Sequence, residues 1–159
     1  MKNILIIGAG VDQVPAIIMA KNMGHYVIAS DINPQAPGFI YADKNYIVST
    51  NDYERNLKIA KDHNIDGVLT LISETAVPVV GKICETLNLP GYDHNIAFAA
   101  TNKNEMHRIM GIHNVPMPRS KDASNIDEAK EIMKNINPPW VIKPSDSSGQ
   151  RGVVIFDDP

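Results

Sequence analysis

Two short apolar runs near the end of the chain enclose a polar loop whose residues suit a polyphosphate. Residues 140–142 and 153–156 are rich in β-branched and aromatic side chains, and the sequence between Ile142 and Val153 is KPSDSSGQRG. This pattern is typical of a β-hairpin with a mobile connection. Small residues let backbone N–H groups approach phosphate oxygens, and Lys143 and Arg151 would offset their charge. An ordinary solvated hairpin loop would use the same residues, and the sequence contains no Walker motif GxxxxGK[ST].

A second group of polar residues follows the strands predicted in the first half of the chain. Gly8-Ala9-Gly10 leads into Val11 and Asp12, Asp31 ends the second predicted strand, and Ser73-Glu74 follows the fourth. Carboxyl ends of parallel strands share one edge of a sheet, and ligands of such sheets bind there. Glu74 has two interpretations at this edge, which are a substrate contact or an acid placed favourably at a helix N-terminus.

The glycine turn and Asp31 match part of a dinucleotide-binding fingerprint. An acid about twenty residues after a GxG turn can hold a ribose hydroxyl. The third position of the fingerprint requires Gly or Ala for close packing of helix on strand, and this chain has Gln13 there. The pattern therefore disfavours a nicotinamide cofactor and leaves Asp31 as either a loop-forming acid or a ribose ligand.

Hydrophobic periodicity predicts an α/β fold with an open parallel sheet. Continuous apolar runs predict strands at residues 2–8, 25–30, 46–49 and 66–72, and helical spacing predicts helices at residues 11–23, 51–63 and 75–87. In the second helix, Asn51-x-x-Glu54 is typical of a capping box with Asn51 as the cap. Strands that alternate with helices favour right-handed crossovers. The residues predicted to face inward from the first helix are Val14, Ile17, Ile18 and Met23.

The pattern changes after residue 92. A short helix is predicted at residues 93–100, and another begins at residues 101–104. Ser124-x-x-Asp127 then predicts the start of an amphipathic helix that ends before the hairpin. The residues predicted to face inward from these last two helices are Met106, Ile109, Met110, Ala129, Ile132, Met133 and Ile136.

Composition excludes several classes of protein. The 159 residues carry a net charge of −3 and are 43% hydrophobic, which is typical of a soluble globular protein and gives no reason to expect nucleic acid as a partner. No apolar run is long enough to span a bilayer, and the N-terminus leads directly into a strand, so we expect a cytoplasmic protein with no membrane partner. A single cysteine, Cys84, rules out an internal disulfide and is interpreted as a core residue. The five histidines lack the spacing of a zinc site, so we expect no structural zinc.

The order of these parts resembles the start of the ATP-grasp superfamily of carboxylate–amine and carboxylate–thiol ligases. The motifs that carry the resemblance are Leu89-Pro90-Gly91, Asn102-Lys103 in place of the family's acid and lysine, Gly111-Ile112-His113-Asn114-Val115-Pro116, and Pro139-Trp140-Val141-Ile142-Lys143-Pro144. The resemblance implies a Rossmann-like pre-ATP-grasp domain at residues 1–92 and the first α+β elements of an ATP-grasp domain at residues 93–159. The polar loop and residues 31–38 are most similar to the glycinamide-ribotide-transformylase, carbamoyl-phosphate-synthase-like and amino-acid-ligase branches.

The same resemblance implies ATP and Mg²⁺ as cofactors and assigns roles to individual residues. Lys103 and Lys143 would contact the phosphates of ATP, and in the transformylase branch Val11, Asp12 and Glu74 would contact the non-nucleotide substrate. The lid that closes over the phosphates would comprise Ser147, Ser148, Gly149, Gln150, Arg151 and Gly152. Such a ligase phosphorylates a carboxylate to an acyl phosphate, which an amine or another nucleophile then attacks, while the closed lid excludes water.

In that family the magnesium-binding acid and Asn, and the strand that holds adenine, lie downstream of the hairpin. We therefore expect a fragment of a ligase that acts on small carboxylate and amine substrates, is inactive alone and has no metal site of its own. The family often uses its Rossmann-like domain for subunit contacts, so the resemblance also suggests a homodimer. Two alternatives stay open, which are a non-catalytic nucleotide- or small-ligand-binding module and one half of a split ligase. An NAD-dependent oxidoreductase is disfavoured by Gln13.

Overall fold

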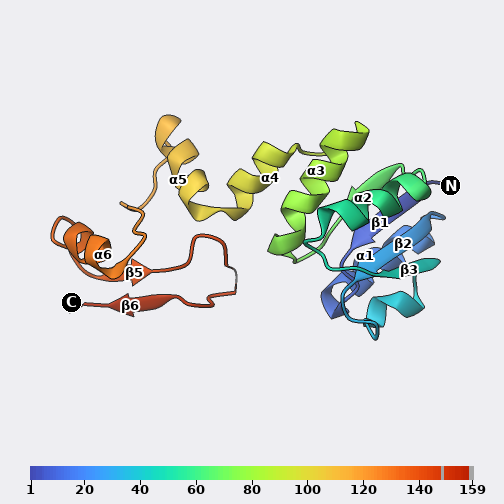
Figure 1. Ribbon diagram of the computed structural model, residues 1–159, viewed down its shortest axis with the longest axis horizontal. Helices are drawn as coiled ribbons and strands as arrows, with labels where there is room; N and C mark the ends of the chain where they lie inside the picture. Colours follow the sequence, from blue (N-terminus) through green and yellow to red (C-terminus); the bar gives the residue numbers. More distant parts are fainter. Residues whose placement is uncertain (148, 158–159) are drawn as a thin grey trace. The chain divides into compact units, whose positions relative to one another are not determined.

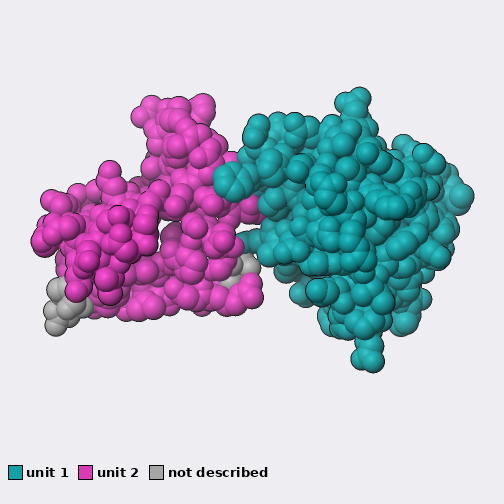
Figure 2. All heavy atoms as spheres, in the orientation of Figure 1, with its two compact units in different colours: residues 1–98 teal, residues 99–159 magenta. Residues whose placement is uncertain are grey.

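The computed structural model of this chain describes residues 1–147 and 149–157. The chain divides into two compact units, Met1–Phe98 and Ala99–Pro159 (Figure 2). The domain boundary that the sequence predicts after residue 92 stays a prediction.

The first unit is built on a four-stranded parallel sheet. The strands are β1 (Asn3–Ile7), β2 (Tyr26–Asp31), β3 (Lys44–Ile47) and β4 (Gly67–Leu69), in the order β3-β2-β1-β4 (Figure 1). In the central strand, Ile4 is in register with Val27 of β2 and with Gly67 of β4. Because parallel strands need crossover connections, helices follow the strands and cover the sheet. The α/β fold class predicted from the sequence is confirmed.

Helices cover both faces of this sheet, which explains why its central strands are apolar on both sides. The elements are η1 (Val11–Gln13), α1 (Val14–Asn22), η2 (Pro37–Ile40), α2 (Tyr53–Asp62), η3 (Glu74–Ala76) and α3 (Val77–Leu87). Leu5, Ile7 and Ile28 pack with residues of α2 and α3, whereas Ile6 and Val27 pack on the opposite face with residues of α1 and η2. The central residues of β1 and β2 are therefore buried.

Four details of the first unit differ from the sequence prediction. Asp52, not Asn51, caps α2, because its carboxylate accepts from the N–H of Arg55 while the Asn51 side chain accepts from Ser49. In the first helix, Ile18 and Met23 are exposed because the face toward the sheet is narrow. Strand β3 begins two residues earlier than predicted, and β4 spans three residues rather than seven.

The second unit consists of short helices and one hairpin. Helix α4 (His94–Thr101) contains the boundary between the units and is followed by α5 (Lys103–Ile112) and α6 (Ile126–Met133). Strands β5 (Trp140–Ile142) and β6 (Val154–Phe156) pair antiparallel, which confirms the predicted hairpin. Asn125 caps α6, because its side chain accepts from the N–H of Glu128, and this cap lies within the segment where the sequence predicts the helix to start.

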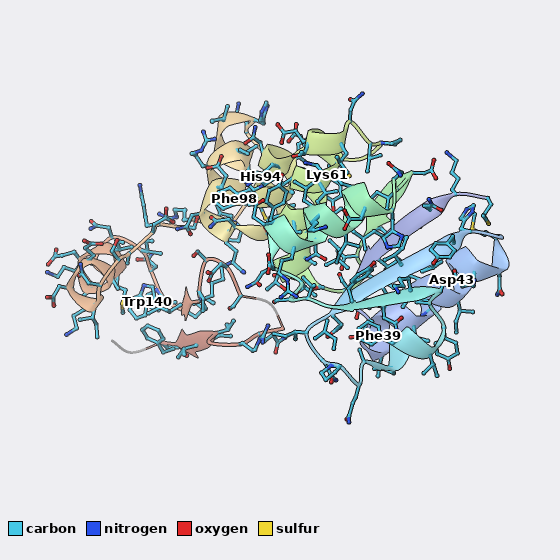
Figure 3. All side chains as sticks on the ribbon, turned by 45° about the vertical axis from the view of Figure 1, so that its right-hand side comes forward. Phe39, Asp43, Lys61, His94, Phe98 and Trp140 are labelled. Carbon is cyan, nitrogen blue, oxygen red and sulfur yellow. The ribbon has the colours of Figure 1, made fainter. Side chains whose placement is uncertain are left out.

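Packing in the second unit is shallow. The Trp140 and Phe156 rings lie 5.8 Å apart between centroids, and the Trp140 indole N–H donates to the Ile136 carbonyl at 2.7 Å (Figure 3). The residues predicted to face inward from α5 and α6 are half-buried. Among the described residues of this unit, none is fully buried. No helix in the described part of the chain is both long enough and apolar enough to cross a membrane.

Candidate functional site

In the second unit, the structure brings Lys103 to the loop that follows β5. Lys103 is the first residue of α5, and the Asn102 side chain caps that helix by accepting from the N–H groups of Asn104 and Glu105, both at 3.1 Å. The Lys103 backbone N–H donates to the Ser145 carbonyl at 2.8 Å, and its ammonium donates to the Ser147 carbonyl at 2.6 Å. Two residues that lie 44 positions apart in the sequence are thereby joined at one end of the polar loop.

The loop itself is turned by residues in the left-handed region. Gly149, Gln150 and Gly152 have φ of 65°, 60° and 72°. At Gly152 a Cβ would also lie 2.9 Å from Cγ of Pro144, so glycine is required there for two reasons. The Ser147 hydroxyl donates to the Arg151 carbonyl at 3.0 Å and closes the turn. Ser148, which the sequence assigns to the same lid, lies outside the described residues.

The charges near this loop favour an anion. Lys143 directly follows β5 and is exposed. On α5, Arg108 donates to both carboxylate oxygens of Glu105, at 2.7 and 2.5 Å, and this hydrogen bonding lowers the pKa of Glu105. Glu105 therefore stays ionised and neutralises Arg108, so that the cation which α5 presents to the loop is Lys103.

In the first unit, the carboxyl edge of the sheet is held by hydrogen bonds from the turn after β1. The N–H of Gly8 donates to the Ser30 carbonyl at 2.7 Å, and the N–H of Ala9 donates to the Asp31 carboxylate at 2.8 Å. The other Asp31 oxygen accepts from the N–H of Asn33 at 2.9 Å. Both oxygens are thus used by backbone groups, which supports the loop-forming interpretation of Asp31 over the ribose one.

Gln13 occupies the space above the glycine turn. Its side chain is buried, and an added Cβ at Gly8 or Gly10 would lie 3.2 or 3.0 Å from its atoms. Its amide group donates to the Leu71 carbonyl. In dinucleotide-binding folds this space admits the pyrophosphate, so the filled turn is a further observation that disfavours a nicotinamide cofactor. In the sequence, Gln13 is visible only as a departure from the Gly or Ala of the fingerprint. Its contact with Leu71 spans 58 positions, so no local pattern indicates it.

The residues assigned to the non-nucleotide substrate follow β1 and β4. Val11 and Asp12 are exposed in η1, and Val11 has 76% of its surface accessible. Glu74 is the first residue of η3 and is exposed, so both of its interpretations stay open. The sequence analysis did not single out Thr75, whose hydroxyl lies 3.4 Å from that of Thr50 and 3.3 Å from that of Ser73. Hydroxyls scattered through separate loops have no local signal that would mark them as one group.

Cys84 does not belong to a reactive site. Its side chain is buried, and burial raises the pKa of the thiol. The thiol donates only a weak, 3.8 Å hydrogen bond to the Pro90 carbonyl. A neutral, enclosed thiol is unreactive, which supports its interpretation as a core residue.

Metal ligands are not clustered in the described residues. No group of three or more His, Cys, Asp or Glu residues in residues 1–147 and 149–157 is arranged to hold a metal ion. Mg²⁺ prefers carboxylate oxygens in octahedral geometry, so these residues do not fit a magnesium centre of their own.

The family model for the PylC-like N-terminal domain matches residues 4–88, which include all of the parallel sheet except Asn3. The chain belongs to this family. The match covers more than half of the chain and includes the glycine turn, Gln13 and Glu74.

Curated relatives extend this similarity beyond the first unit. A formate-dependent phosphoribosylglycinamide formyltransferase from Prochlorococcus marinus is 27% identical over 159 residues, covering 99% of this chain and 40% of the relative. An uncharacterized protein, y4rH, from Sinorhizobium fredii is 34% identical over 101 residues, covering 64% of this chain and 21% of the relative. The chain thus spans less than half the length of these relatives.

Solved structures agree with the sequence relatives. A phosphoribosylglycinamide synthetase from Anaerococcus prevotii is 26% identical, with a TM-score of 0.75, and the match covers 99% of this chain and 39% of that one. An N5-carboxyaminoimidazole synthetase from Staphylococcus aureus complexed with ADP shares the fold at 16% identity, with a TM-score of 0.81 and coverage of 99% and 42%. The resemblance of this chain to the N-terminal part of ATP-grasp ligases is confirmed.

Proposed function

We propose that this chain is the N-terminal part of an ATP-dependent ligase that joins a small carboxylate to an amine through an acyl phosphate. The carboxyl edge of the parallel sheet would contact the non-nucleotide substrate through Val11, Asp12 and Glu74. The second unit would contact the phosphates of ATP through Lys103, Lys143 and the loop at residues 147–152. The observation that carries the proposal is the contact between the Lys103 ammonium and the Ser147 carbonyl.

That contact supports a phosphate role because it places the ammonium group of Lys103 directly against the polar loop. An ammonium that donates to a neutral carbonyl can exchange it for a phosphate oxygen, which is a stronger, charged acceptor. The rest of the loop offers backbone N–H groups and turns that admit close approach of an anion. Both lysines would therefore lie near the transferred phosphoryl group, where positive charge stabilises the transition state.

Phosphorylation of a carboxylate by ATP requires neutralisation of phosphate charge more than it requires a nucleophilic side chain. A carboxylate is a poor acyl donor until ATP phosphorylates it, and the amine then displaces phosphate. Positioning and electrostatic stabilisation supply most of the catalysis in phosphoryl transfer. The described residues offer cations and N–H donors for this purpose, and in this proposal the Mg²⁺ used by ATP-grasp ligases is held by residues outside those described here. A cytoplasmic location stays a prediction from the sequence, and a homodimer stays a prediction from the family resemblance.

Binding of a fluorescent ATP analogue to the 159-residue chain tests the nucleotide site. We expect saturable binding that Lys103→Met and Lys143→Ala each weaken about tenfold, because each removes a charge-assisted hydrogen bond to phosphate. Lys130→Ala is the matched control, since Lys130 is an exposed lysine of the same unit on α6. Binding that survives both of the first two substitutions would contradict the proposal and favour a ligand module that uses other residues.

A further inference from the structure

The buried side chain of Gln13 links two loops at the carboxyl edge of the parallel sheet. One loop runs from the glycine turn through η1, and the other runs from the end of β4 to η3. The Gln13 amide group lies over Gly8 and Gly10 and donates to the Leu71 carbonyl of the second loop. Gln13 is only 7% exposed, although its immediate neighbours Val11 and Asp12 are exposed.

The second loop needs such support because its backbone is unusual. Ile72 has a φ of 54°, and its side chain is 77% exposed. The left-handed region is unfavourable for a β-branched residue, so the surrounding contacts must hold it there. Leu71, which accepts the hydrogen bond from Gln13, directly precedes this residue. The hydrogen bond therefore acts at the point where the loop has the strongest tendency to relax.

The two loops carry the residues assigned to the substrate. Val11 and Asp12 directly precede Gln13, and Glu74 lies three residues after Leu71. We propose that Gln13 is a positioning residue, whose buried amide fixes the spacing between Val11–Asp12 and Glu74 without itself contacting the substrate. This inference rests on the proposed function, because that proposal assigns substrate contacts to this edge of the sheet. The hydrogen bond between Gln13 and Leu71 is observed independently of that proposal.

Chemistry at Leu71 distinguishes this role from simple filling of space. A carbonyl oxygen accepts a hydrogen bond and offers no donor, so Gln13 must present its NH₂ group there. Methionine has nearly the same length and volume as glutamine but no donor. Histidine at this position retains a ring N–H and is a partial replacement. Gln13→Met thus removes the hydrogen bond with little change in packing, and Gln13→His restores a donor.

The test uses amide hydrogen exchange and ligand titration of the 159-residue chain by NMR. In Gln13→Met we expect the amides of Ala76 and Val77, which donate to the Ser73 and Glu74 carbonyls at the end of the second loop, to exchange about tenfold faster. Those of Leu5 and Ile28 in the core should keep their wild-type rates. Gln13→His is expected to recover part of that protection. With phosphoribosylglycinamide as the probe, we expect Gln13→Met to weaken binding by a similar factor.

The outcomes separate this inference from the proposed function. Equal acceleration of core and loop amides in Gln13→Met would overturn the inference, because Gln13 would then serve only global stability. Unchanged probe binding in Gln13→Met, with tight binding by the wild type, would overturn the positioning role and leave the substrate edge standing. A probe that binds the wild type but is unaffected by Asp12→Ala and Glu74→Ala would overturn the substrate edge itself.

Discussion

The two units of this chain differ most in how they exclude water. In residues 1–98, both faces of the sheet are covered and Leu5, Ile7 and Ile28 are fully buried. In the described part of residues 99–159 no residue is fully buried, and Val141, Ile142, Val154 and Ile155 of the hairpin are exposed. Burial of apolar surface is the main stabilising term in folding. The first unit is therefore a stable platform, whereas the second depends on helix caps, turns and the contact between Lys103 and Ser147.

This difference fits the two proposed tasks. A substrate edge benefits from loops held rigidly by buried groups such as Gln13 and Asn56. A phosphate-binding loop that closes over its ligand needs small residues and weak local packing. The comparison predicts that substitutions in the first unit change global stability, whereas equivalent substitutions in the second change local order.

The largest effect is expected for truncation of a core leucine. Leu5→Ala removes a fully buried side chain from the central strand and should lower the free energy of unfolding by about 2–5 kcal/mol. Ile155→Ala, at a position 68% exposed in β6, should change it by less than about 0.5 kcal/mol. Urea unfolding followed by circular dichroism measures both. Similar losses for the two variants would contradict the difference in burial between Leu5 and Ile155.

A buried asparagine of the first unit should give the next largest effect on the free energy of unfolding. Asn56 is fully buried, accepts from the Ser30 hydroxyl, and donates to the carbonyls of Ser49 and Asp52. Asn56→Ala leaves these groups without their partner, and we expect a loss of about 2–3 kcal/mol in the free energy of unfolding of the first unit. The same urea titration gives the midpoint of unfolding. A brief pulse of a thiol-reactive fluorescent dye at each urea concentration labels the buried Cys84 only in molecules whose first unit is unfolded. A loss below about 0.5 kcal/mol would mean that water replaces Asn56 without penalty.

The cap of α5 should give a smaller and more local effect. Asn102→Ala removes the side chain that accepts from the N–H groups of Asn104 and Glu105, which should destabilise α5 by about 1 kcal/mol. Asn102→Asp, which restores the acid typical of ATP-grasp ligases, should keep the cap. Amide exchange in residues 103–112 reports on both variants. Equal exchange in Asn102→Ala and the wild type would show that the cap contributes nothing.

The smallest expected effect is the loss of the stabilising contribution of Asp43 at acid pH. Burial opposes ionisation of Asp43, but hydrogen bonds from Lys21 and from the N–H of Val27 outweigh it and lower its pKa below the usual 3.8 (Figure 3). A carboxylate with a lowered pKa stabilises the fold above its unfolded pKa, and this contribution disappears as the pH falls through the folded value. Asp43→Asn should therefore lower the urea midpoint at pH 6, and the difference from the wild type should shrink below about pH 4. A difference that is constant down to pH 2 would contradict this assignment.

The sequence predicted elements better than it predicted contacts. Continuous apolar runs located β1 and β2 because the central residues of both strands are buried, and two apolar runs around a polar loop located the hairpin. Local signals were ambiguous where two similar residues are adjacent, so Asn51 was predicted to be the cap that Asp52 provides. The contacts of Gln13 with Leu71 and of Lys103 with Ser147 join distant segments, and no periodicity in the chain reports on them.

The proposed division of labour has one direct test, which is to map ATP onto the 159-residue chain by NMR titration. We predict saturable shifts of the amides of Lys103, Gly149 and Gly152 whose midpoint moves to about tenfold higher ATP in Lys143→Ala, with no shifts at Gly8 and Gly10. Shifts centred on Gly8 and Gly10, or shifts at the hairpin whose midpoint is unchanged in Lys143→Ala, would contradict the assignment of the nucleotide to the second unit.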